Sequence, residues 1–369
     1  MYGPVAEIHL GRLAANYHNI QQLVGNAKVL AVVKANGYGH GMIPVARRLA
    51  VEGVHGFGVA ILQEALELRS AGIRNMILHM GRFDPDHIGL YVQQDIRLTI
   101  QDLADIEHLA KFNAATGHEV VAHLKVDTGM GRLGVPYEQA LEALEGIAAQ
   151  SAIRLEGIFG HFATAGEEDQ SFMRYQLVRF TQLVHNTRKL NLNVEYFHTA
   201  NSSAIVNDPE SHFNMVRPGL LLYGALPSLD VKPPFEPQPV MDLKAPLVLK
   251  KEIRRGMPVG YGRVFRAPQD TRVGTLQIGY ADGLQVALAG KYAVELAGKA
   301  FNLIGRVSMD TCNIDLGTAD PECGEMALIW GLGSDRQLRV EQLAELARTI
   351  SYELLVNTGT RVERVYVED

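Results

Sequence analysis

Cysteine is scarce in this sequence, with only Cys312 and Cys323 among 369 residues, and the two form no metal-binding or redox motif. No apolar run is long enough to span a bilayer. The first residues, MYGPVAEIHLGRL, lack the basic region and apolar core of a signal peptide. The formal net charge is −6, which argues against a strongly basic nucleic-acid surface. These absences lead us to expect a cytoplasmic protein.

The composition and length indicate two globular domains. Hydrophobic residues make up 47% of the chain and charged residues 21%, which is close to the globular average and enough for a large core. A chain of 369 residues is ordinary for two domains. Residues 226–240 contain five prolines and no helical period, so we expect a linker there. The sequence therefore predicts domains over 1–228 and 229–369.

The first domain alternates strand-like apolar runs with helix-like segments. Eight strand-like runs precede the linker: Lys28–Lys34, Gly56–Ile61, Asn75–Met80, Ile96–Ile100, Glu119–Val126, Leu155–His161, Tyr196–Thr199 and Met215–Tyr223. Helix-like segments lie between most of them: Gln63–Ala71, Gln101–Ala115, Pro136–Gln150, Glu167–Leu190 and Ser202–Val206. Alternating strands and helices predict a parallel sheet. Eight repeats predict a closed (β/α)8 barrel of the TIM type, so the fold class is α/β.

Beyond the linker the pattern changes to short strands separated by turn residues, which predicts a mostly-β C-terminal domain. The runs are Pro246–Ile253, Thr271–Ile278, Tyr292–Leu296, Phe301–Ile304, Thr311–Leu316 and Met326–Trp330. One helix, Val340–Ile350, is expected before the final strand. The N-terminal run Ala6–Leu10 is also strand-like, and residues 1–10 are a candidate to pair with this second domain.

The most informative stretch follows the first strand of the barrel. The apolar run ends at Lys34, and three glycines follow at Gly37, Gly39 and Gly41. A glycine-rich turn straight after a strand lets the backbone approach a ligand closely. A lysine at the end of a buried strand lies in low dielectric, which favours its neutral, nucleophilic form. Since neutral amines form Schiff bases with aldehydes, Lys34 suits a pyridoxal phosphate (PLP) lysine, although a solvent-exposed lysine would give the same pattern.

The active site of a TIM-type barrel lies at the carboxyl ends of its strands. Arg217 follows a buried-looking strand there, and a buried arginine needs an anionic or acceptor partner. Ser202 begins a short helix, and Gly219 lies close to Arg217. A hydroxyl group, a bare backbone N–H and a helix N-terminus therefore converge where such barrels bind phosphate.

Three other polar groups at the strand ends fit a site but also fit structural roles. His161 ends the sixth strand and would equally suit a buried core histidine. Arg132 follows the fifth strand and would equally suit a solvated surface position. Asn201, which precedes Ser202, would equally suit a helix cap.

Two further motifs would indicate dinucleotide binding or metal binding, but both are weak. Gly129–Gly134 is a GxGxxG that follows a strand, but a dinucleotide fingerprint also needs an acidic residue at the end of the next strand. Glu156 has roughly the right spacing but begins its strand. His161 lies near the acidic run 167–169, yet no metal-ligand spacing occurs, and we expect that run to occupy the first turn of a helix.

The second domain carries three glycine-flanked loops. They are VGYGR around Tyr261, GYADG around Tyr280 and GRVSMD, which ends in Met309 and Asp310. Any one of them would suit a β-turn. Three such loops in one small domain, with tyrosines that the flanking glycines leave exposed, predict an edge of the domain that binds a ligand. A tyrosine can donate or accept a catalytic proton if nearby cations lower its pKa.

The motifs together resemble the alanine racemase family of fold type III PLP enzymes. The segments are AVVKANGYGHG, KVDTGMGRLG, GHFATA, TANSSA, MVRPGLLLYG, VGYGRVF, GYADG and GRVSMD, in the family's order and along nearly the whole chain. The resemblance implies a homodimer of barrel and β-domain subunits. It also implies a racemase that interconverts L- and D-alanine through a PLP aldimine and two bases.

The resemblance assigns Lys34 as the Schiff-base lysine and as one of the two bases. Tyr38, Ser202, Gly219 and Tyr352 resemble ligands of the cofactor phosphate, with Asn201 beside them.

Four more barrel residues resemble family site residues. Arg217 resembles the arginine that faces the pyridine nitrogen, and His161 resembles its neighbour at the ring. Arg132 resembles the residue that orients the substrate carboxylate and bonds the phenolic oxygen of the cofactor. Lys125 resembles a lysine that is often carbamylated and pairs with that arginine.

The second domain supplies the remaining group. Tyr261 resembles the second base, which reaches in from the partner subunit. Met309 and Asp310 resemble the partner's substrate-binding loop, and Tyr280 resembles a tyrosine at the substrate entrance. The stretch from Tyr352 to Arg364 lacks the cysteine and the Arg-Val-Pro-Arg that are usual in the family, so dimer details and substrate range are less well defined by the resemblance.

The resemblance leaves other functions open. The nearest is a serine or broad-specificity racemase of the same fold. A basic amino acid decarboxylase shares the two-domain plan but is expected to have a catalytic cysteine. A PLP-carrier protein resembles only the barrel. An alanine racemase would supply D-alanine for peptidoglycan or serve alanine catabolism.

Overall fold

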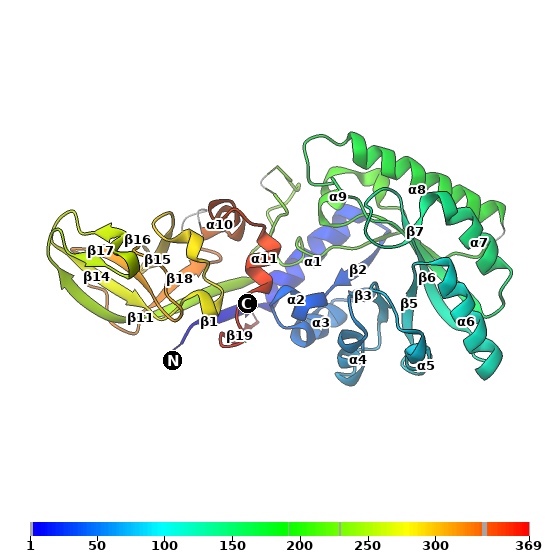
Figure 1. The fold of residues 1–369 in the computed structure, drawn as a ribbon, viewed down its shortest axis with the longest axis horizontal. Helices are drawn as coiled ribbons and strands as arrows, with labels where there is room; N and C mark the ends of the chain where they lie inside the picture. The colour runs from blue at the N-terminus through cyan, green and yellow to red at the C-terminus, as the bar shows by residue number, and fades with distance from the viewer. Residues whose placement is uncertain (1–2, 191, 229, 334–337, 369) are drawn as a thin grey trace.

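The computed structural model describes residues 3–190, 192–228, 230–333 and 338–368, which form two domains joined end to end (Figure 1). The predicted domain boundary at 229 and the first two residues of segment 1–10 lie outside the described residues. No helix in the described ranges is both long and apolar enough to cross a membrane.

The N-terminal domain is a barrel-like parallel sheet, which confirms the predicted fold class. Its main strands are β2 (Lys28–Val32), β3 (Gly56–Val59), β4 (Met76–His79), β5 (Ile96–Ile100), β6 (Val120–Asp127), β8 (Ile153–Phe159), β9 (Tyr196–His198) and β10 (Met215–Val216). They pair in the order β10-β2-β3-β4-β5-β6-β8-β9, and the short β7 (Val135–Pro136) pairs with β6. Just beyond β10, the Arg217 N–H donates to the Ala200 carbonyl at 2.9 Å. This bond joins the segments that follow β10 and β9, so the sheet closes there into a barrel.

Helices connect the strands and cover the outside of the barrel (Figure 1). They are α1 (Leu10–Val24), α3 (Met42–Val51), α4 (Leu62–Ser70), α5 (Ile88–Gln93), α6 (Leu103–Thr116), α7 (Ala140–Ala148), α8 (Ser171–Lys189) and α9 (Ser202–Asn207), with 3-10 turns η1 (Pro85–His87), η2 (Tyr137–Gln139) and η3 (Pro209–Ser211). Helix α6 illustrates the local signals. Asp102 and Asp105 form a capping box at its start, and Gly117 ends it with φ 73°.

The C-terminal domain is an antiparallel sheet that closes on itself, as predicted for a mostly-β domain. Its strands are β11 (Met241–Ile253), β14 (Thr271–Leu276), β15 (Ala293–Leu296), β16 (Lys299–Ile304), β17 (Cys312–Gly317) and β18 (Met326–Trp330). They follow the order β14-β17-β16-β15-β18-β11, and β14 pairs again with β11. A hairpin of β12 (Pro258–Val259) and β13 (Phe265–Arg266) extends from it, with the turns η4 (Tyr261–Arg263), η5 (Tyr280–Asp282) and η6 (Val286–Leu288).

The two ends of the chain meet between the domains. Strand β1 (Val5–His9) pairs antiparallel with β11 and parallel with β19 (Glu363–Val367). Before β19, the helices α10 (Val340–Ala347) and α11 (Ser351–Val356) pack together. The guanidinium group of Arg364 donates to the carbonyl oxygens of Gly39 at 3.1 Å and Thr358 at 2.7 Å. The last strand is therefore tied directly to the turn that follows β2.

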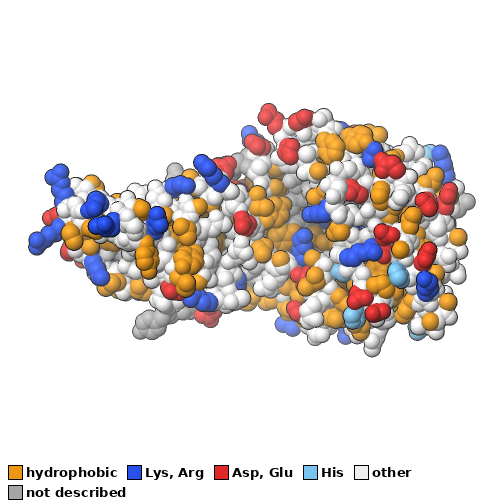
Figure 2. All heavy atoms as spheres, viewed as in Figure 1, with side chains coloured by type: hydrophobic (Ala, Val, Ile, Leu, Met, Phe, Trp, Pro, Cys, Tyr) orange, Lys and Arg blue, Asp and Glu red, His pale blue; other side chains and the backbone are white. Residues whose placement is uncertain are grey.

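Charge is distributed unevenly over the molecule. Figure 2 shows Lys and Arg side chains gathered at the outer end of the C-terminal domain, although the chain as a whole carries a net charge of −6. Exposed side chains of the β11–β14 connection contribute to this basic end: Arg254, Arg255 and Arg266. The same connection contains Tyr261.

Several predicted boundaries are wrong. The strand predicted over Met215–Tyr223 ends at Val216, because Pro218 has no N–H for a ladder and the chain turns at Gly219. The helix predicted from Pro136 begins at Ala140 after a 3-10 turn. Acidic residues 167–169 precede α8 rather than occupy its first turn, and Asp169 accepts a hydrogen bond from the Ser171 N–H at 2.8 Å.

Candidate active site

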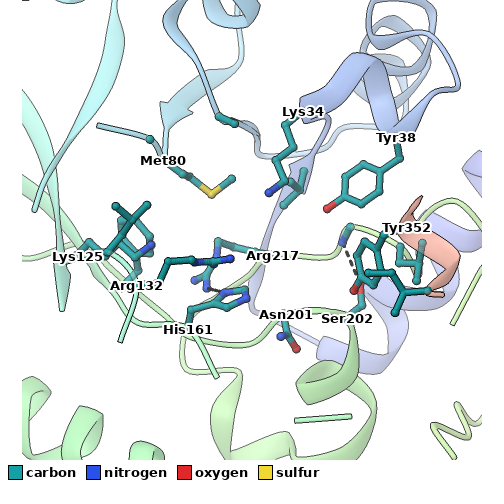
Figure 3. Close-up of a pocket in the computed structure, with 18 residues that line it drawn as sticks. Lys34, Tyr38, Met80, Lys125, Arg132, His161, Asn201, Ser202, Arg217 and Tyr352 are labelled. Carbon is teal, nitrogen blue, oxygen red and sulfur yellow. Dashed lines mark hydrogen bonds between the residues drawn. The ribbon is translucent and has the colours of Figure 1, made fainter. Parts of the chain in front are cut away.

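A cavity of about 590 Å³ opens at the carboxyl ends of the barrel strands (Figure 3). Ten of the predicted residues line it: Lys34, Tyr38, Lys125, Arg132, His161, Asn201, Ser202, Arg217, Gly219 and Tyr352. Nine of them belong to the barrel, and Tyr352 comes from α11. The volume lies in the usual range for small-molecule and cofactor sites.

Lys34 begins a short turn of left-handed backbone, α2 (Lys34–Tyr38). Ala35, Asn36 and Tyr38 have φ of 52°, 53° and 53°, in a region that residues other than glycine rarely adopt. Gly37 continues the turn at φ 61°. The sequence predicted a glycine-rich turn here, and the structure adds three non-glycine residues to it. Such a turn persists only when its surroundings hold it.

Contacts from several elements hold this turn. Glu64 in α4 accepts from the Ala35 N–H at 2.7 Å through one carboxylate oxygen, and from the Ala60 N–H at 2.8 Å through the other. The Asn36 side chain accepts from the Met42 N–H at 2.9 Å. The His40 ring lies within hydrogen-bond distance of the Tyr38 carbonyl oxygen. Glu64 thus joins the loops after β2 and β3.

The Lys34 amine projects into the cavity (Figure 3). Burial lowers its pKa, the charge of Arg132 lowers it further, and Glu64 acts in the opposite direction. A lowered pKa increases the neutral fraction of the amine, which is the nucleophilic form.

Tyr38, Ser202 and Tyr352 form one corner of the cavity (Figure 3), and Gly219 lies beside the first two. The Ser202 hydroxyl oxygen accepts from the backbone N–H groups of Gly219 at 3.0 Å and Leu221 at 3.2 Å. A Cβ on Gly219 would overlap the Tyr38 hydroxyl group, so glycine is required for this approach. Tyr38 is buried, which raises its pKa and keeps its hydroxyl protonated as a donor.

Arg217 is 4% exposed, and its guanidinium group bonds neutral acceptors. Its guanidinium group donates to the carbonyl oxygens of Gly160 at 2.7 Å and His198 at 2.6 Å, and to Nδ1 of His198 at 2.9 Å. A longer bond of 3.3 Å reaches Nδ1 of His161. No described carboxylate pairs with it, and burial lowers its pKa to about 9. Since arginine can only donate, His161 accepts through Nδ1 and carries its proton on Nε2.

Lys125 and Arg132 occupy the opposite side of the cavity from Tyr38 (Figure 3). Lys125 lies over the Phe159 ring, with Nζ 5.5 Å from the ring centroid. Burial, together with the charges of Arg217 and Arg132, lowers the pKa of Lys125 to about 8. The neutral form of this amine is therefore a minor species near neutral pH, but a far larger fraction than in an ordinary lysine.

Asp127 fixes the loop that carries Arg132. Its carboxylate accepts from the N–H groups of Gly129 at 2.9 Å, Met130 at 2.7 Å, Gly131 at 2.8 Å and Arg132 at 3.1 Å. These N–H groups of the GxGxxG loop are therefore already hydrogen-bonded to the Asp127 carboxylate of the protein itself. It also leads into β7 rather than directly into a helix, so it does not form the phosphate turn of a dinucleotide fold.

Four predicted residues do not line this cavity: Tyr261, Tyr280, Met309 and Asp310. They lie on exposed loops of the C-terminal domain, and Tyr261 has 71% of its surface exposed. The loops of Tyr280 and Met309 are joined, since the Tyr280 N–H donates to Ser308 at 3.0 Å and the Ala281 N–H donates to Met309 at 3.1 Å. Arg361 donates to Asp310 at 2.8 Å.

Sequence inspection missed Glu64 and Asp127, although each left a local signal. Glu64 stands at the third position of a helix, where a carboxylate caps the preceding backbone. Asp127 precedes a Thr-Gly turn, where an aspartate side chain commonly bonds the following N–H groups. Phe159 and Met80 also line the cavity, and their apolar side chains left no such signal.

The cavity is rich in cations. None of the described residues that line it has a carboxylate or thiol group, whereas Lys34, Lys125, Arg132 and Arg217 all contribute positive charge. Its single histidine does not make a metal-ligand set. The fold and the cavity therefore define a two-domain barrel protein whose lysine-centred site suits a small, anionic ligand.

Comparisons with known proteins identify the family. Residues 8–227 match the model for "Alanine racemase, N-terminal domain", and residues 240–366 match that for "Alanine racemase, C-terminal domain". An alanine racemase of Desulforamulus reducens is 39% identical over 366 residues, 98% of each chain. The alanine racemase structure from Streptomyces lavendulae is 33% identical, with a TM-score of 0.94 over 100% of this chain and 98% of that one. The structure from Bacillus anthracis with bound L-Ala-P is 30% identical, with a TM-score of 0.90 over 100% and 96%. The chain belongs to the alanine racemase family and is an isomerase of that family.

Proposed function

We propose that this protein interconverts L- and D-alanine with pyridoxal phosphate held in the barrel cavity. The observation that carries the proposal is the carboxylate-free, cationic cavity into which a lysine amine of lowered pKa projects. When bound, pyridoxal phosphate supplies the electron sink that makes the α-proton of an attached amino acid acidic.

The chain offers a partner for each part of the cofactor. Lys34 would hold the aldehyde carbon. The Tyr38 and Ser202 hydroxyl groups would hold the phosphate, with Tyr352 and Asn201 beside them. The Gly219 N–H, which donates to the Ser202 hydroxyl oxygen in this structure, would join them by turning that bond over to the phosphate. The glycine at 219 lets the Tyr38 hydroxyl group lie against the backbone, so hydroxyl groups and a backbone N–H stand together at this corner, as a phosphate site needs.

Arg217 would lie at the ring nitrogen, with His161 beside it. Because the guanidinium group can only donate, a nitrogen that it faces accepts a hydrogen bond and carries no proton. Arg132 would orient the substrate carboxylate. Lys125, with its pKa of about 8, would react with carbon dioxide to form a carbamate that pairs with Arg132.

Racemisation needs a base on each face of the α-carbon, and Lys34 would serve one face. We propose that Tyr261 of a partner subunit serves the other, since Tyr261 is exposed and absent from the lining of its own cavity. Met309, Asp310 and Tyr280 of the partner would complete the substrate side. The protein would then act as a homodimer with shared sites, formed from domains divided near residue 228.

We further propose that the enzyme works in the cytoplasm, where it would supply D-alanine for peptidoglycan or serve alanine catabolism. A serine or broad-specificity racemase remains the second candidate. A decarboxylase with a catalytic cysteine is the more distant candidate, because Cys312 is buried outside the cavity and Cys323 does not line the cavity of its own chain.

The experiment measures loss of optical activity from L-alanine and L-serine, with and without added pyridoxal phosphate. Faster turnover of serine would move the assignment to the second candidate. Lys34→Ala and Tyr261→Phe are each expected to lose nearly all activity, with Tyr261→Phe still binding the cofactor. A PLP carrier would show no racemisation in the unaltered protein.

Mixing the two inactive variants tests the shared site. A heterodimer of Lys34→Ala and Tyr261→Phe subunits has one site with both bases intact and one with neither. Random re-association is therefore expected to restore about a quarter of the unaltered activity, because half of the dimers are mixed and each has one working site. No recovery in dimers shown to have exchanged subunits would rule out a base supplied by the partner.

A further inference from the structure

A buried chain of polar side chains leads away from Arg217 through the barrel interior. Arg217 donates to Nδ1 of His198 at 2.9 Å, and Nε2 of His198 lies 2.9 Å from Nδ1 of His123. Nε2 of His123 lies 3.3 Å from a carboxylate oxygen of Glu156. Both histidines are fully buried, and Glu156 is 5% exposed. The chain crosses three adjacent strands, β6, β8 and β9.

The chemistry of the four groups fixes the direction of every hydrogen bond. The guanidinium group can only donate, so the Arg217–His198 bond forms only when His198 accepts through Nδ1 and carries its proton on Nε2. His198 then donates to Nδ1 of His123, which leaves the His123 proton on Nε2. That proton points to the Glu156 carboxylate. Each donor therefore faces the carboxylate end, and reversing one bond would set two donors against each other.

The backbone is adapted to this chain. The pairing of β6 with β8 shifts by one residue between Ala122 and His123, so Glu156 lies at a β-bulge, a feature that re-aims side chains. A Cβ at Gly157 would come within 2.5 Å of the His123 ring, so glycine makes room for that imidazole. The His198 ring stacks on Phe159, with centroids 4.9 Å apart and planes inclined by 9°.

Two arginines hold the carboxylate at the far end. Arg97 donates to both oxygens of Glu156, at 3.0 and 3.3 Å, and Arg154 donates to one at 3.2 Å. Burial tends to raise the pKa of Glu156, but the bonds from His123 and Arg97 lower it to about 2, so the group is ionised. Burial lowers the pKa of both histidines, in agreement with neutral rings.

We propose that Glu156 is a positioning residue for Arg217, which acts through His123 and His198 by locking both imidazoles as the Nε2–H tautomer. The locked rings present a fixed acceptor to a guanidinium group that no described carboxylate reaches. This inference rests on the proposed role of Arg217 at the cofactor ring. Glu156 lies outside the cavity and touches neither substrate nor cofactor.

The lock has a definite physical consequence. If His198 carried its proton on Nδ1, that N–H would face the Arg217 N–H, and the guanidinium group would lose an acceptor and turn. Carboxylates that orient metal-binding histidines act in the same way, and their removal typically costs about 10- to 100-fold in function. For loss of Glu156 we expect a decrease near the low end of this range, about tenfold in kcat, because the carbonyl oxygens of Gly160 and His198 still hold Arg217.

The experiment follows the tautomers in the holoenzyme. Long-range ¹H–¹⁵N spectra of protein labelled with ¹⁵N-histidine report which ring nitrogen carries the proton, and kcat and KM for L-alanine are measured in parallel. Three variants are compared. Glu156→Gln removes the charge, His123→Leu breaks the chain but leaves the Glu156–Arg97 pair, and Arg154→Gln is the control that alters the same carboxylate from its outer side.

In the unaltered protein both rings are expected as Nε2–H tautomers. Glu156→Gln and His123→Leu should each give a mixed or reversed His198 tautomer and a tenfold lower kcat with KM within twofold, whereas Arg154→Gln should match the unaltered protein. A different tautomer in the unaltered protein, an unchanged His198 in both variants, or an equal loss of kcat in the control would overturn the proposal. The spectra test the chain even if alanine is not racemised, so failure of the proposed function would be recognised separately.

Discussion

Replacing Glu64 by glutamine tests whether the left-handed turn at Lys34 is held from outside the cavity. The carboxylate has two oxygens, and each accepts from a backbone N–H of a different loop, at Ala35 and at Ala60. A glutamine amide has one oxygen, so one of these N–H groups would face an NH2 group instead. The change preserves size and shape and removes one acceptor from the turn.

The magnitude follows from the contacts. A left-handed residue other than glycine costs roughly 1–2 kcal/mol, and this turn contains Ala35, Asn36 and Tyr38 in that conformation. A hydrogen bond to a charged group contributes about 1.5–3 kcal/mol. Losing the hydrogen bond from the Ala35 N–H to Glu64 would therefore remove much of the free energy that offsets the strain of the left-handed turn. If the whole loss appears in cofactor binding, the dissociation constant of pyridoxal phosphate rises about 10- to 100-fold.

The assay titrates apoprotein with pyridoxal phosphate and follows the absorbance of the lysine-bound cofactor, with Tm measured on the same samples. Asp105→Asn is the matched control. Asp105 caps α6 through the N–H groups of Gln101 at 2.8 Å and Asp102 at 3.0 Å, as Glu64 caps α4, but it has no bond to the Lys34 turn. The control should lower Tm and leave cofactor affinity unchanged. Equal cofactor affinity in Glu64→Gln and Asp105→Asn would refute the reasoning.

Three further predictions concern other parts of the site. Gly219→Ala should weaken cofactor binding at least tenfold, because its Cβ would overlap the buried Tyr38 hydroxyl group. Gly89→Ala is the control and should bind the cofactor normally, because its Cβ would come no closer than 3.8 Å to another group. Equilibrium titration of both variants with pyridoxal phosphate tests this prediction. Native mass spectrometry should find the mass of one bound carbon dioxide on the unaltered protein and none on Lys125→Arg, since the pKa of about 8 leaves neutral amine to react. Glu156 has a pKa lowered from 4.5 to about 2 by folding, so its charge stabilises the protein above about pH 4.5, and this contribution is lost as pH falls toward 2. The Tm difference between the unaltered protein and Glu156→Gln should accordingly be full at neutral pH and narrow below pH 4.5, and a difference that widens toward acid would contradict this assignment.

The sequence predicted the barrel and several residues of its cavity because those signals are local, whereas Tyr38, Lys125 and Tyr352 were placed in the site only by the family resemblance. Apolar runs mark the strands, and the polar residue that follows each run lies at the carboxyl end. Lys34, His161 and Ser202 could therefore be placed together without the structure. The same reasoning predicted too long a strand after Met215, since an apolar run from Leu220 to Leu222 looks like a strand whether or not its N–H groups can join a ladder.

The parts that sequence could not predict depend on contacts between distant segments. Helix α1 begins at Leu10 without a capping side chain, so no start signal marks it. Tyr352 stands on the six-residue helix α11, which was not predicted because so short a pattern carries little periodicity. The chain from Glu156 to Arg217 requires a β-bulge and a tautomer lock, and neither has a sequence signature.

The contact of Arg364 with Gly39 has a consequence for how the enzyme is made. On a ribosome the Lys34 turn is made before the strands that flank β2, which are β3 and the much later β10. Strand β19 bonds to Gly39 and α11 supplies Tyr352, and both are synthesised after all the barrel strands. A nascent barrel therefore has the amine but lacks one wall of its cavity. Capture of the cofactor should therefore be delayed until α11 and β19 have been made and have packed against the barrel.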